Sequence, residues 1–235
     1  MSIILEKVES MSVLVVGGAG YIGSVTVERL LAVDESVIVY DNFSTGNRGA
    51  VSPYAILIEG DILNTQKLAS IMRDHEIDTV MHFAAYIEVG ESVTNPLKYF
   101  DNNLVGAHSI MKAMIETNIR RFIFSSTAAV YGMPETVPIT EDAPVAPINP
   151  YGLSKLMIEQ MLDWHGRAHG LNHVILRYFN ACGASPTYGE AHSPESHLIP
   201  NILFAASGMR NKIMVFGNDY DTPDGTNVRD YVHVG

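Results

Sequence analysis

A glycine-rich turn at residues 17–23 (GGAGYIG) constrains the fold of this chain more than any other feature of its sequence. It follows a β-branched run at residues 13–16, opens a segment of helical character, and contains both the G-x-G-x-x-G and the G-x-x-G-x-x-G spacing. Glycines in such a turn let backbone N–H groups approach a pyrophosphate at the N-terminus of a helix. The turn therefore predicts a strand–turn–helix unit that binds a dinucleotide.

An acidic residue, Asp41, follows the next apolar run at residues 37–40. Asp41 lies at the sequence distance from the glycine turn that is typical of a carboxylate which accepts hydrogen bonds from the adenosine ribose of a dinucleotide. The same carboxylate would repel a 2′-phosphate, so Asp41 favours NAD over NADP. Arg48 would favour NADP, which is the weaker interpretation. Without a ligand the same residues would be only a turn and a strand-end cap, but the order of strand, turn, helix, strand and acid argues against that.

Short apolar runs alternate with segments long enough for helices along the first three quarters of the chain. This alternation is typical of a parallel sheet with helices on both faces, and continuous apolar runs indicate strands that are covered on both sides. We therefore predict an α/β fold with a Rossmann-type doubly wound parallel sheet and ligand groups at the carboxyl ends of its strands. The predicted strands are residues 13–16, 37–40, 55–58, 79–83, 121–124 and 173–176.

Three regions follow from this pattern. Residues 1–11 form an extension before the first strand, residues 12–179 form the NAD-binding Rossmann domain, and residues 180–235 begin a smaller substrate-binding region. In the last region we predict a helix at residues 198–207 and a strand at residues 213–216.

Composition excludes several classes of protein. Of the 235 residues 47% are hydrophobic and 17% are charged, which indicates a packed globule rather than a disordered chain. The formal net charge of −11 argues against binding to nucleic acid or to an anionic membrane. No stretch approaches the ~20 apolar residues of a membrane span, and the first residues lack the basic region of a signal peptide. The single cysteine, Cys182, fits a reducing cytoplasm, where we expect the protein.

A tyrosine and a lysine at helical spacing form the candidate catalytic group. Asn149 is a good N-cap and Pro150 suits the first turn, so Tyr151 and Lys155 share one face of the helix that begins there. A neighbouring ammonium and a positive nicotinamide ring would favour the phenolate, which makes Tyr151 a general base. Thr127, at the end of the fifth predicted strand, offers a hydroxyl that bridges this phenol and the reacting oxygen.

A metal site is the alternative function for the loop that holds Glu190, His192, Glu195 and His197. The spacing is not that of common zinc motifs and no thiolate is present, so a solvated loop without metal is the favoured interpretation.

Together these motifs resemble the UDP-glucose 4-epimerase family of extended short-chain dehydrogenases/reductases. The resemblance extends from Val13 almost to the last residue, through GGAGYIGS, DNFSTG, HFAA, VGESV, NPLKYFDNN, FSSTAAVYG, NPYGLSK, LRYFNACGA, HLIP and FGNDYDTPDGTNVRDYVHV. The VGESV, RYFN and DGTxxRDY runs are the most particular to this family. The family's sequences continue well beyond the position of Gly235, so the chain resembles a C-terminally truncated member, with exposed apolar surface and an open substrate cleft as the expected result.

The resemblance implies NAD as the cofactor and UDP-glucose and UDP-galactose as the substrates. It implies that Tyr151, with Thr127 and Lys155, handles the proton of the sugar 4-hydroxyl while hydride passes from C4 to NAD and returns to the opposite face of a 4-keto sugar. The residues implied to contact NAD are Gly17, Gly20, Tyr21, Ile22, Gly23, Asp41, Asn42, Phe43, Ser44, Thr45, Gly46, Asp61, Ile62, Phe83, Ala84, Ala85, Asn102, Tyr151, Lys155 and Phe179. Those implied to contact the UDP-sugar are Thr127, Tyr151, Asn180, His197, Leu198, Phe216 and Arg229, the last with a guanidinium fork for the diphosphate.

The chain departs from the family pattern at two places. Ile87 stands where many members have a lysine near the cofactor phosphates, and Glu88 adds a negative charge beside it, so we expect a change in NAD affinity. His197 replaces an asparagine that is common in the substrate loop, which puts that contact in doubt.

Other functions remain as alternatives. A nucleotide-sugar dehydratase needs an acid and a base where this chain has Ala128 and Ala129. A UDP-glucuronate 4-epimerase would call for additional cationic residues, which the sequence does not offer. An inactive NAD-binding module would account for Ile87 and Glu88, but not for the retained Tyr151. Residues 93–119 have apolar side chains at helical spacing, which fits either intramolecular core or, as the resemblance implies, a homodimer interface.

Overall fold

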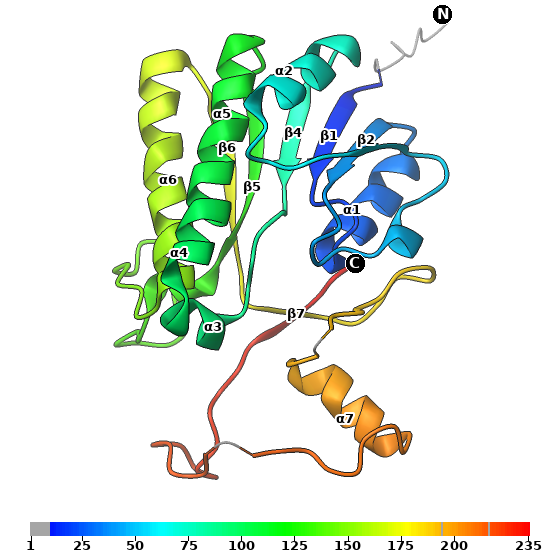
Figure 1. Cartoon of the computed structure of the whole chain (residues 1–235). Coiled ribbons are helices and arrows are strands. Elements are labelled where there is room, and N and C mark those ends of the chain that lie inside the picture. The colour runs from blue at the N-terminus through cyan, green and yellow to red at the C-terminus, as the bar shows by residue number, and fades with distance from the viewer. Residues whose placement is uncertain (1–9, 194, 216) are drawn as a thin grey trace, which may run out of the picture.

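The centre of the molecule is a six-stranded, all-parallel sheet in the order β3-β2-β1-β4-β5-β6 (Figure 1). The structure, a computed structural model, describes residues 10–193, 195–215 and 217–235. The strand order reverses between β1 and β4, and such a switch point is where open α/β sheets bind ligands. The predicted doubly wound parallel sheet is confirmed. Its strands are β1 Ser12–Val16, β2 Ser36–Asp41, β3 Ile56–Glu59, β4 Thr79–His82, β5 Arg121–Thr127 and β6 Asn172–Tyr178.

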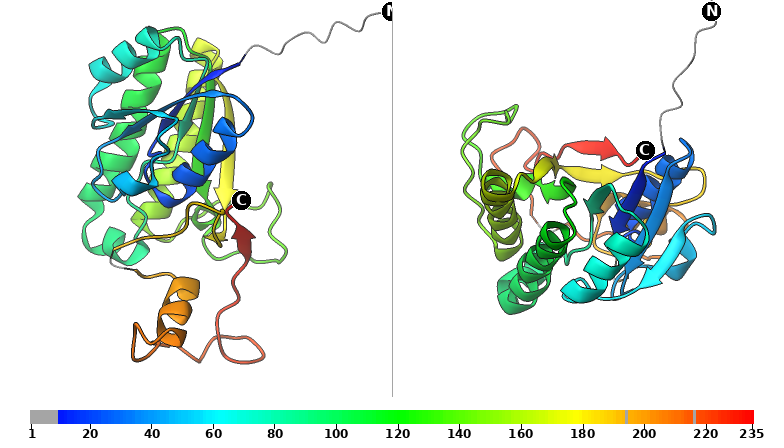
Figure 2. Two further views of the ribbon diagram at one scale, coloured as in Figure 1. Left: turned by 90° about the vertical axis from the view of Figure 1, so that its right-hand side faces the viewer. Right: turned by 90° about the horizontal axis from the view of Figure 1, so that it is seen from above.

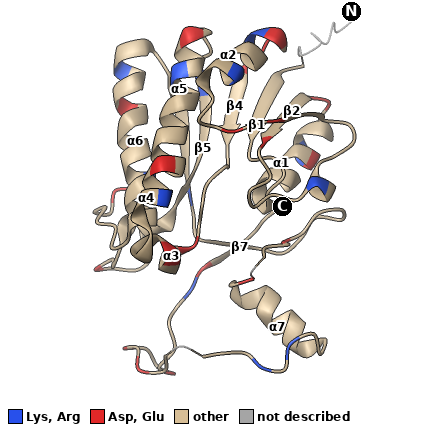
Figure 3. Cartoon of the chain, in the orientation of Figure 1, with Lys and Arg blue, Asp and Glu red and all other residues tan. Residues whose placement is uncertain are grey.

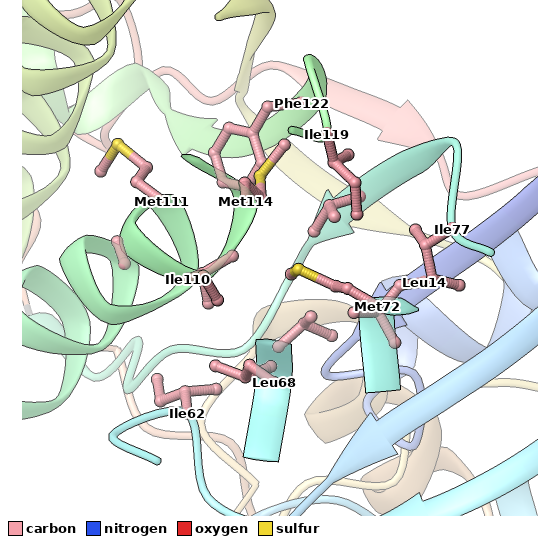
Figure 4. Packing of buried hydrophobic residues seen from close by; sticks show 14 of the residues in the cluster. Leu14, Ile62, Leu68, Met72, Ile77, Ile110, Met111, Met114, Ile119 and Phe122 are labelled. Carbon is pink, nitrogen blue, oxygen red and sulfur yellow. The ribbon is translucent and has the colours of Figure 1, made fainter. Parts of the chain in front are cut away.

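Helices cover both faces of the sheet, as predicted. On one face α1 (Tyr21–Leu31) packs Val27 against a layer of valines from β1 and β2. On the other face α2 (Thr65–Asp74), α5 (Gly106–Glu116) and α6 (Pro150–His169) bury the larger core, part of which is drawn in Figure 4. Residues of β1 alternate between the two layers, because successive strand side chains point to opposite faces. Among the fully buried side chains of the larger core are Leu14, Leu68, Met72, Ile110, Met114 and Phe122.

The two edge strands are less buried than the sequence suggested. Ile56 and Leu57 in β3 and Val174 in β6 are exposed. The expected burial on both sides is therefore wrong for these strands, because the flanking helices pack over the middle of the sheet. Charged residues lie mainly on the outer faces and ends of the helices and in the loops (Figure 3).

The segment between β4 and β5 is a broken helical rod. It consists of α3 (Val89–Thr94), α4 (Pro96–Tyr99), a π-helical turn η2 (Phe100–Val105) and α5. The break after Thr94 has a simple cause, since Pro96 has no N–H to donate and restricts the residue before it. The π-helical turn has an extra residue, which is common at functional sites.

Beyond β6 the chain leaves the layered part, and Figures 1 and 2 show α7 (Leu198–Ala206) standing apart from it. Here β7 (Asn180–Cys182) pairs in parallel with β8 (Tyr231–His233). The predicted helix is confirmed, but the predicted strand at residues 213–216 is wrong for residues 213–215, which are exposed and pair with no strand among the described residues. Phe216 lies outside the described residues, as do residues 1–9 of the expected extension.

Among the helices that the structure describes, none is both long and apolar enough to cross a membrane.

Candidate functional site

The glycine turn closes tightly over the carboxyl end of β1. Gly17 has a φ of +85°, and a Cβ there would lie 2.4 Å from the backbone nitrogen of Ala84; a Cβ on Gly23 would lie 2.2 Å from the carbonyl oxygen of Gly17. Only glycine fits at either place. Within the described structure Gly20 is the N-cap of α1 and provides no side-chain cap, so the first N–H groups of the helix and its positive end are directed at the turn. This cradle fits the pyrophosphate of a dinucleotide.

Asp41 connects the turn to the end of β2. One carboxylate oxygen accepts a hydrogen bond from Ala19 N at 3.0 Å and the other accepts one from Phe43 N at 2.8 Å. Each oxygen keeps a second lone pair that can accept from a ribose hydroxyl. Arg48, the residue that would favour NADP, is paired with Glu59 and lies over the Phe43 ring. The geometry therefore fits NAD better than NADP.

The other residues expected at the cofactor follow the same edge of the sheet. Asn42 donates to Asp61 at 3.0 Å, which joins the loops after β2 and β3. Phe83 N and Ala84 N both donate to the carbonyl oxygen of Val16, which holds the end of β4 against the turn. Ser44, Thr45 and Gly46 continue the loop after β2, Tyr21 and Ile22 begin α1, Ile62 and Ala85 follow β3 and β4, and Phe179 follows β6.

Sequence reasoning named Asn102 but missed its neighbour Asn103. The buried Asn103 amide accepts from Tyr86 N at 2.9 Å and donates to Tyr86 O at 3.0 Å, while Asn102 donates to Asn103 at 2.9 Å. The π-helical turn thus fixes the loop that follows β4. The Asn-Asn doublet was the available signal, but its pairing with Tyr86 depends on tertiary structure.

The candidate catalytic residues meet where β5 and α6 approach each other. Thr127 ends β5, and Tyr151 and Lys155 lie one turn apart at the start of α6. Burial raises the pKa of Tyr151, while a hydrogen bond with the Thr127 side chain lowers it in part. The buried Lys155 amine donates to Ser125 O at 2.8 Å and lies 4.9 Å from the centre of the Phe124 ring. Burial lowers the pKa of Lys155 to about 7, and Glu159 opposes this effect.

Sequence reasoning also missed a charged network between α6 and β6, centred on Glu159, which lies one turn after Lys155. Arg177 of β6 donates to the two carboxylate oxygens of Glu159 at 3.2 and 2.7 Å and to the Tyr131 hydroxyl at 2.9 Å. The Ser126 hydroxyl also donates to Glu159. An arginine within the apolar run of β6, and a glutamate one turn after Lys155, were the signals that could have revealed this network.

Removing the cap of α6 tests how firmly the helix start is held. The Asn149 side chain accepts from Gly152 N at 2.8 Å, so Asn149→Ala is expected to lower the free energy of unfolding by about 1 kcal/mol. Urea titration measures this loss. Asn211→Ala, in the exposed segment after α7, is the control; equal midpoints for the two variants would contradict the capping role.

Apart from Thr127 and Tyr151, the residues expected at the sugar nucleotide lie in the segment beyond β6. The pairing of β7 with β8 brings Asn180 beside the Asp230–Tyr231 peptide, one residue after Arg229, and the Asn180 amide donates to Asp230 O at 2.7 Å. His197 and Leu198 begin α7. Glu88, which lies beside the departure at Ile87, accepts from Ser196 just before them at 3.1 Å. Phe216 lies outside the described residues.

Comparisons with known proteins agree with this geometry. The model of the NAD dependent epimerase/dehydratase family matches residues 13–235. The chain belongs to this family. It is 52% identical over 227 residues to the UDP-glucose 4-epimerase of Streptococcus mutans, covering 95% of the chain and 68% of the relative. The UDP-glucose 4-epimerase of Lactobacillus helveticus is 53% identical over 226 residues, with coverages of 95% and 68%.

Two solved structures show the same fold. The UDP-glucose 4-epimerase of Brucella ovis in complex with NAD superposes with a TM-score of 0.92 at 48% identity, covering 96% of this chain and 70% of that one. The enzyme of Bifidobacterium longum in complex with NAD+ and UDP gives a TM-score of 0.91 at 40% identity, with coverages of 95% and 70%. The family resemblance predicted from the motifs is confirmed, and the chain spans roughly two thirds of these relatives.

Proposed function

We propose that this chain interconverts UDP-galactose and UDP-glucose by reversible oxidation at C4 of the sugar, with NAD as the cofactor. The observation that carries the proposal is the meeting of Thr127, Tyr151 and Lys155 beside a glycine cradle of dinucleotide type. The high identity to UDP-glucose 4-epimerases over nearly the whole chain supports the choice of reaction.

In this proposal the edge of the sheet holds NAD. The turn at residues 17–23 receives the pyrophosphate, Asp41 accepts from the adenosine ribose, and the loops after β3 and β4 complete the site together with Asn102. Bound NAD supplies a hydride acceptor that is regenerated in each turnover, and a positive charge beside the phenol.

Tyr151 takes and returns the proton of the sugar 4-hydroxyl. Because burial raises the pKa of the phenol, its ionised form requires nearby stabilisation. The Thr127 hydroxyl supplies a hydrogen bond to the phenol of Tyr151. Lys155, one turn further along α6, supplies a nearby positive charge when it is protonated. The Glu159 carboxylate favours that protonated state, since its charge raises the pKa of Lys155 against burial. The network with Arg177 thus has a positioning role in the proton transfer.

The segment beyond β6 would bind the sugar nucleotide. Asn180, His197 and Leu198 would contact it, Phe216 is proposed from its sequence position alone, and the exposed guanidinium of Arg229 would pair with the diphosphate. We assign residues 12–179 to the NAD-binding domain and residues 180–235 to the substrate-binding region.

We also propose a homodimer formed through the broken helical rod and α6. Val93, Leu97 and Trp164 are 60%, 72% and 68% exposed on these neighbouring helices, where a second copy would cover them. The single cysteine supports a cytoplasmic location, and the net charge of −11 argues against nucleic acid as a partner.

Conversion of UDP-galactose to UDP-glucose by the purified chain tests the proposal, together with an assay of NAD released on denaturation. We expect turnover and close to one NAD per chain. Turnover of UDP-glucuronate alone would favour the alternative epimerase, and bound NAD without turnover of either sugar would leave an NAD-binding module. Absence of both NAD and turnover would contradict the proposed function.

A further inference from the structure

Four side chains that can bind a metal ion converge in the segment between β7 and α7. They are Glu190, His192, Glu195 and His197, and their ligand atoms all lie within 4.8 Å of one another. His197 Nδ1 is 2.7 Å from a carboxylate oxygen of Glu190 and 2.8 Å from one of Glu195, and His192 Nδ1 is 3.1 Å from that same Glu190 oxygen. We call this group the Glu/His cluster.

The cluster is not the solvated loop expected from the sequence. The Glu190 and Glu195 side chains are only 8% and 4% exposed. Buried carboxylates require compensating positive charge. Among the described residues, the two imidazoles and the backbone N–H of His197 contact their oxygens, while Arg210 donates to the backbone oxygen of Glu195 rather than to its carboxylate. The solvated-loop interpretation is therefore wrong.

We propose that the Glu/His cluster binds one divalent transition-metal cation of the zinc class through two imidazole nitrogens and two carboxylate oxygens. Such a cation balances two carboxylates with the imidazoles neutral, which is the same net charge as two carboxylates with two imidazolium ions. Imidazole and carboxylate ligands without thiolate suit Zn²⁺, Co²⁺ and Mn²⁺. A metal ion or bound protons would thus supply the same compensating positive charge to the buried carboxylates.

The ligand atoms lie close enough together to surround such an ion, although their spacing differs from that of an occupied site. Bonds of about 2.0–2.2 Å in a tetrahedral site place ligand atoms roughly 3.3–3.6 Å apart. The cluster's closest pairs, at 2.7–3.1 Å, lie below this range and its widest pair, at 4.8 Å, lies above it. An ion would require shifts of side-chain torsions rather than a new path of the backbone.

The surroundings suggest a structural role for the ion. The His192 ring lies edge-on to the Tyr21 ring at a centroid distance of 6.4 Å, and the Tyr21 hydroxyl donates to Gly183 O at 2.6 Å. A metal at the cluster would therefore fix the segment between β7 and α7 and hold the His192 ring against Tyr21 at the start of α1. This role takes no part in hydride transfer, although it shares His197 with the proposed contact to the sugar nucleotide.

Cobalt binding tests the inference in the full chain. After treatment with a chelator, the protein is titrated with Co²⁺ at about pH 8, where protons compete less with the metal. We expect one Co²⁺ per chain, the visible absorption of four-coordinate cobalt, and loss of that absorption on addition of Zn²⁺. Absence of the four-coordinate absorption, or binding with no fixed stoichiometry, would overturn the proposal.

A pair of histidine variants separates this site from adventitious binding. His192→Gln is expected to weaken Co²⁺ binding by at least ~10–100-fold, the cost seen even for lost outer-shell partners. His165→Gln is the matched control, because His165 belongs to a different histidine group, with ring centroids 6.0 Å from His108 and 5.5 Å from His169. Circular dichroism and NAD content show that both variants are folded. Unchanged binding in His192→Gln, or equal loss in His165→Gln, would refute the assignment.

Discussion

Replacing Tyr151 with phenylalanine is expected to lower kcat for the conversion of UDP-galactose by about 10²–10⁴-fold, the usual contribution of a positioned general base. The variant loses one hydroxyl, which takes the proton and meets Thr127, and keeps the ring that packs at the start of α6. NAD content and the urea midpoint should therefore change little. A coupled assay of UDP-glucose formation measures the loss.

Tyr54→Phe is the control for this experiment, since it removes a phenol hydroxyl from an exposed loop. It should retain wild-type kcat. If Tyr151→Phe retained it as well, another group would have to accept the proton, and the proposed mechanism would be wrong.

Replacing Arg177 with methionine is expected to lower the free energy of unfolding by about 3–5 kcal/mol, the cost of leaving one partner of a buried ion pair alone. The Glu159 carboxylate is buried and accepts two hydrogen bonds from this guanidinium. Methionine fills much of the volume but provides no charge. Urea or thermal unfolding followed by circular dichroism measures the change.

A double-mutant cycle distinguishes the pair from a general packing effect. In a Glu159→Gln background the same Arg177→Met change leaves no unpaired carboxylate, so its cost should fall by more than 1 kcal/mol, within the usual range for coupled residues. Equal costs in the two backgrounds would show that Arg177 acts through packing alone.

Local signals predicted most of the fold. The glycine turn, the β-branched strands and the Asn149-Pro150 start of α6 each depend on a few consecutive residues, and each lies where it was expected. The three-residue strand β8 was missed because its only support is pairing with β7, about fifty positions earlier in the chain. Conversely, the apolar residues 213–215 form no strand, because they have no partner strand within the part of the chain that the structure describes.

The candidate site likewise contains residues that could be predicted from the sequence and residues that could not. Tyr151 and Lys155 could be named because a helix places them together, and Asp41 because a strand end follows a known spacing. Asn103, Glu159 and Arg177 could not be paired from the sequence, because their partners come from distant elements. The Glu/His cluster was visible as a short motif, but the burial of its carboxylates depends on how the segment folds back on itself.

The short β7–β8 ladder closes a long loop that runs from Gly183 to Asp230 and carries α7. Since the entropy of loop closure grows only slowly, by about 0.6 kcal/mol for each doubling of length, extra residues in this loop cost little. The exposed stretch after α7 is therefore the place where an inserted peptide tag or a fused domain would disturb the catalytic sheet least. The β7–β8 ladder tolerates substitution less well than this loop. A single proline within its three residue pairs would disrupt the strand pairing and release the loop from Gly183 to Asp230.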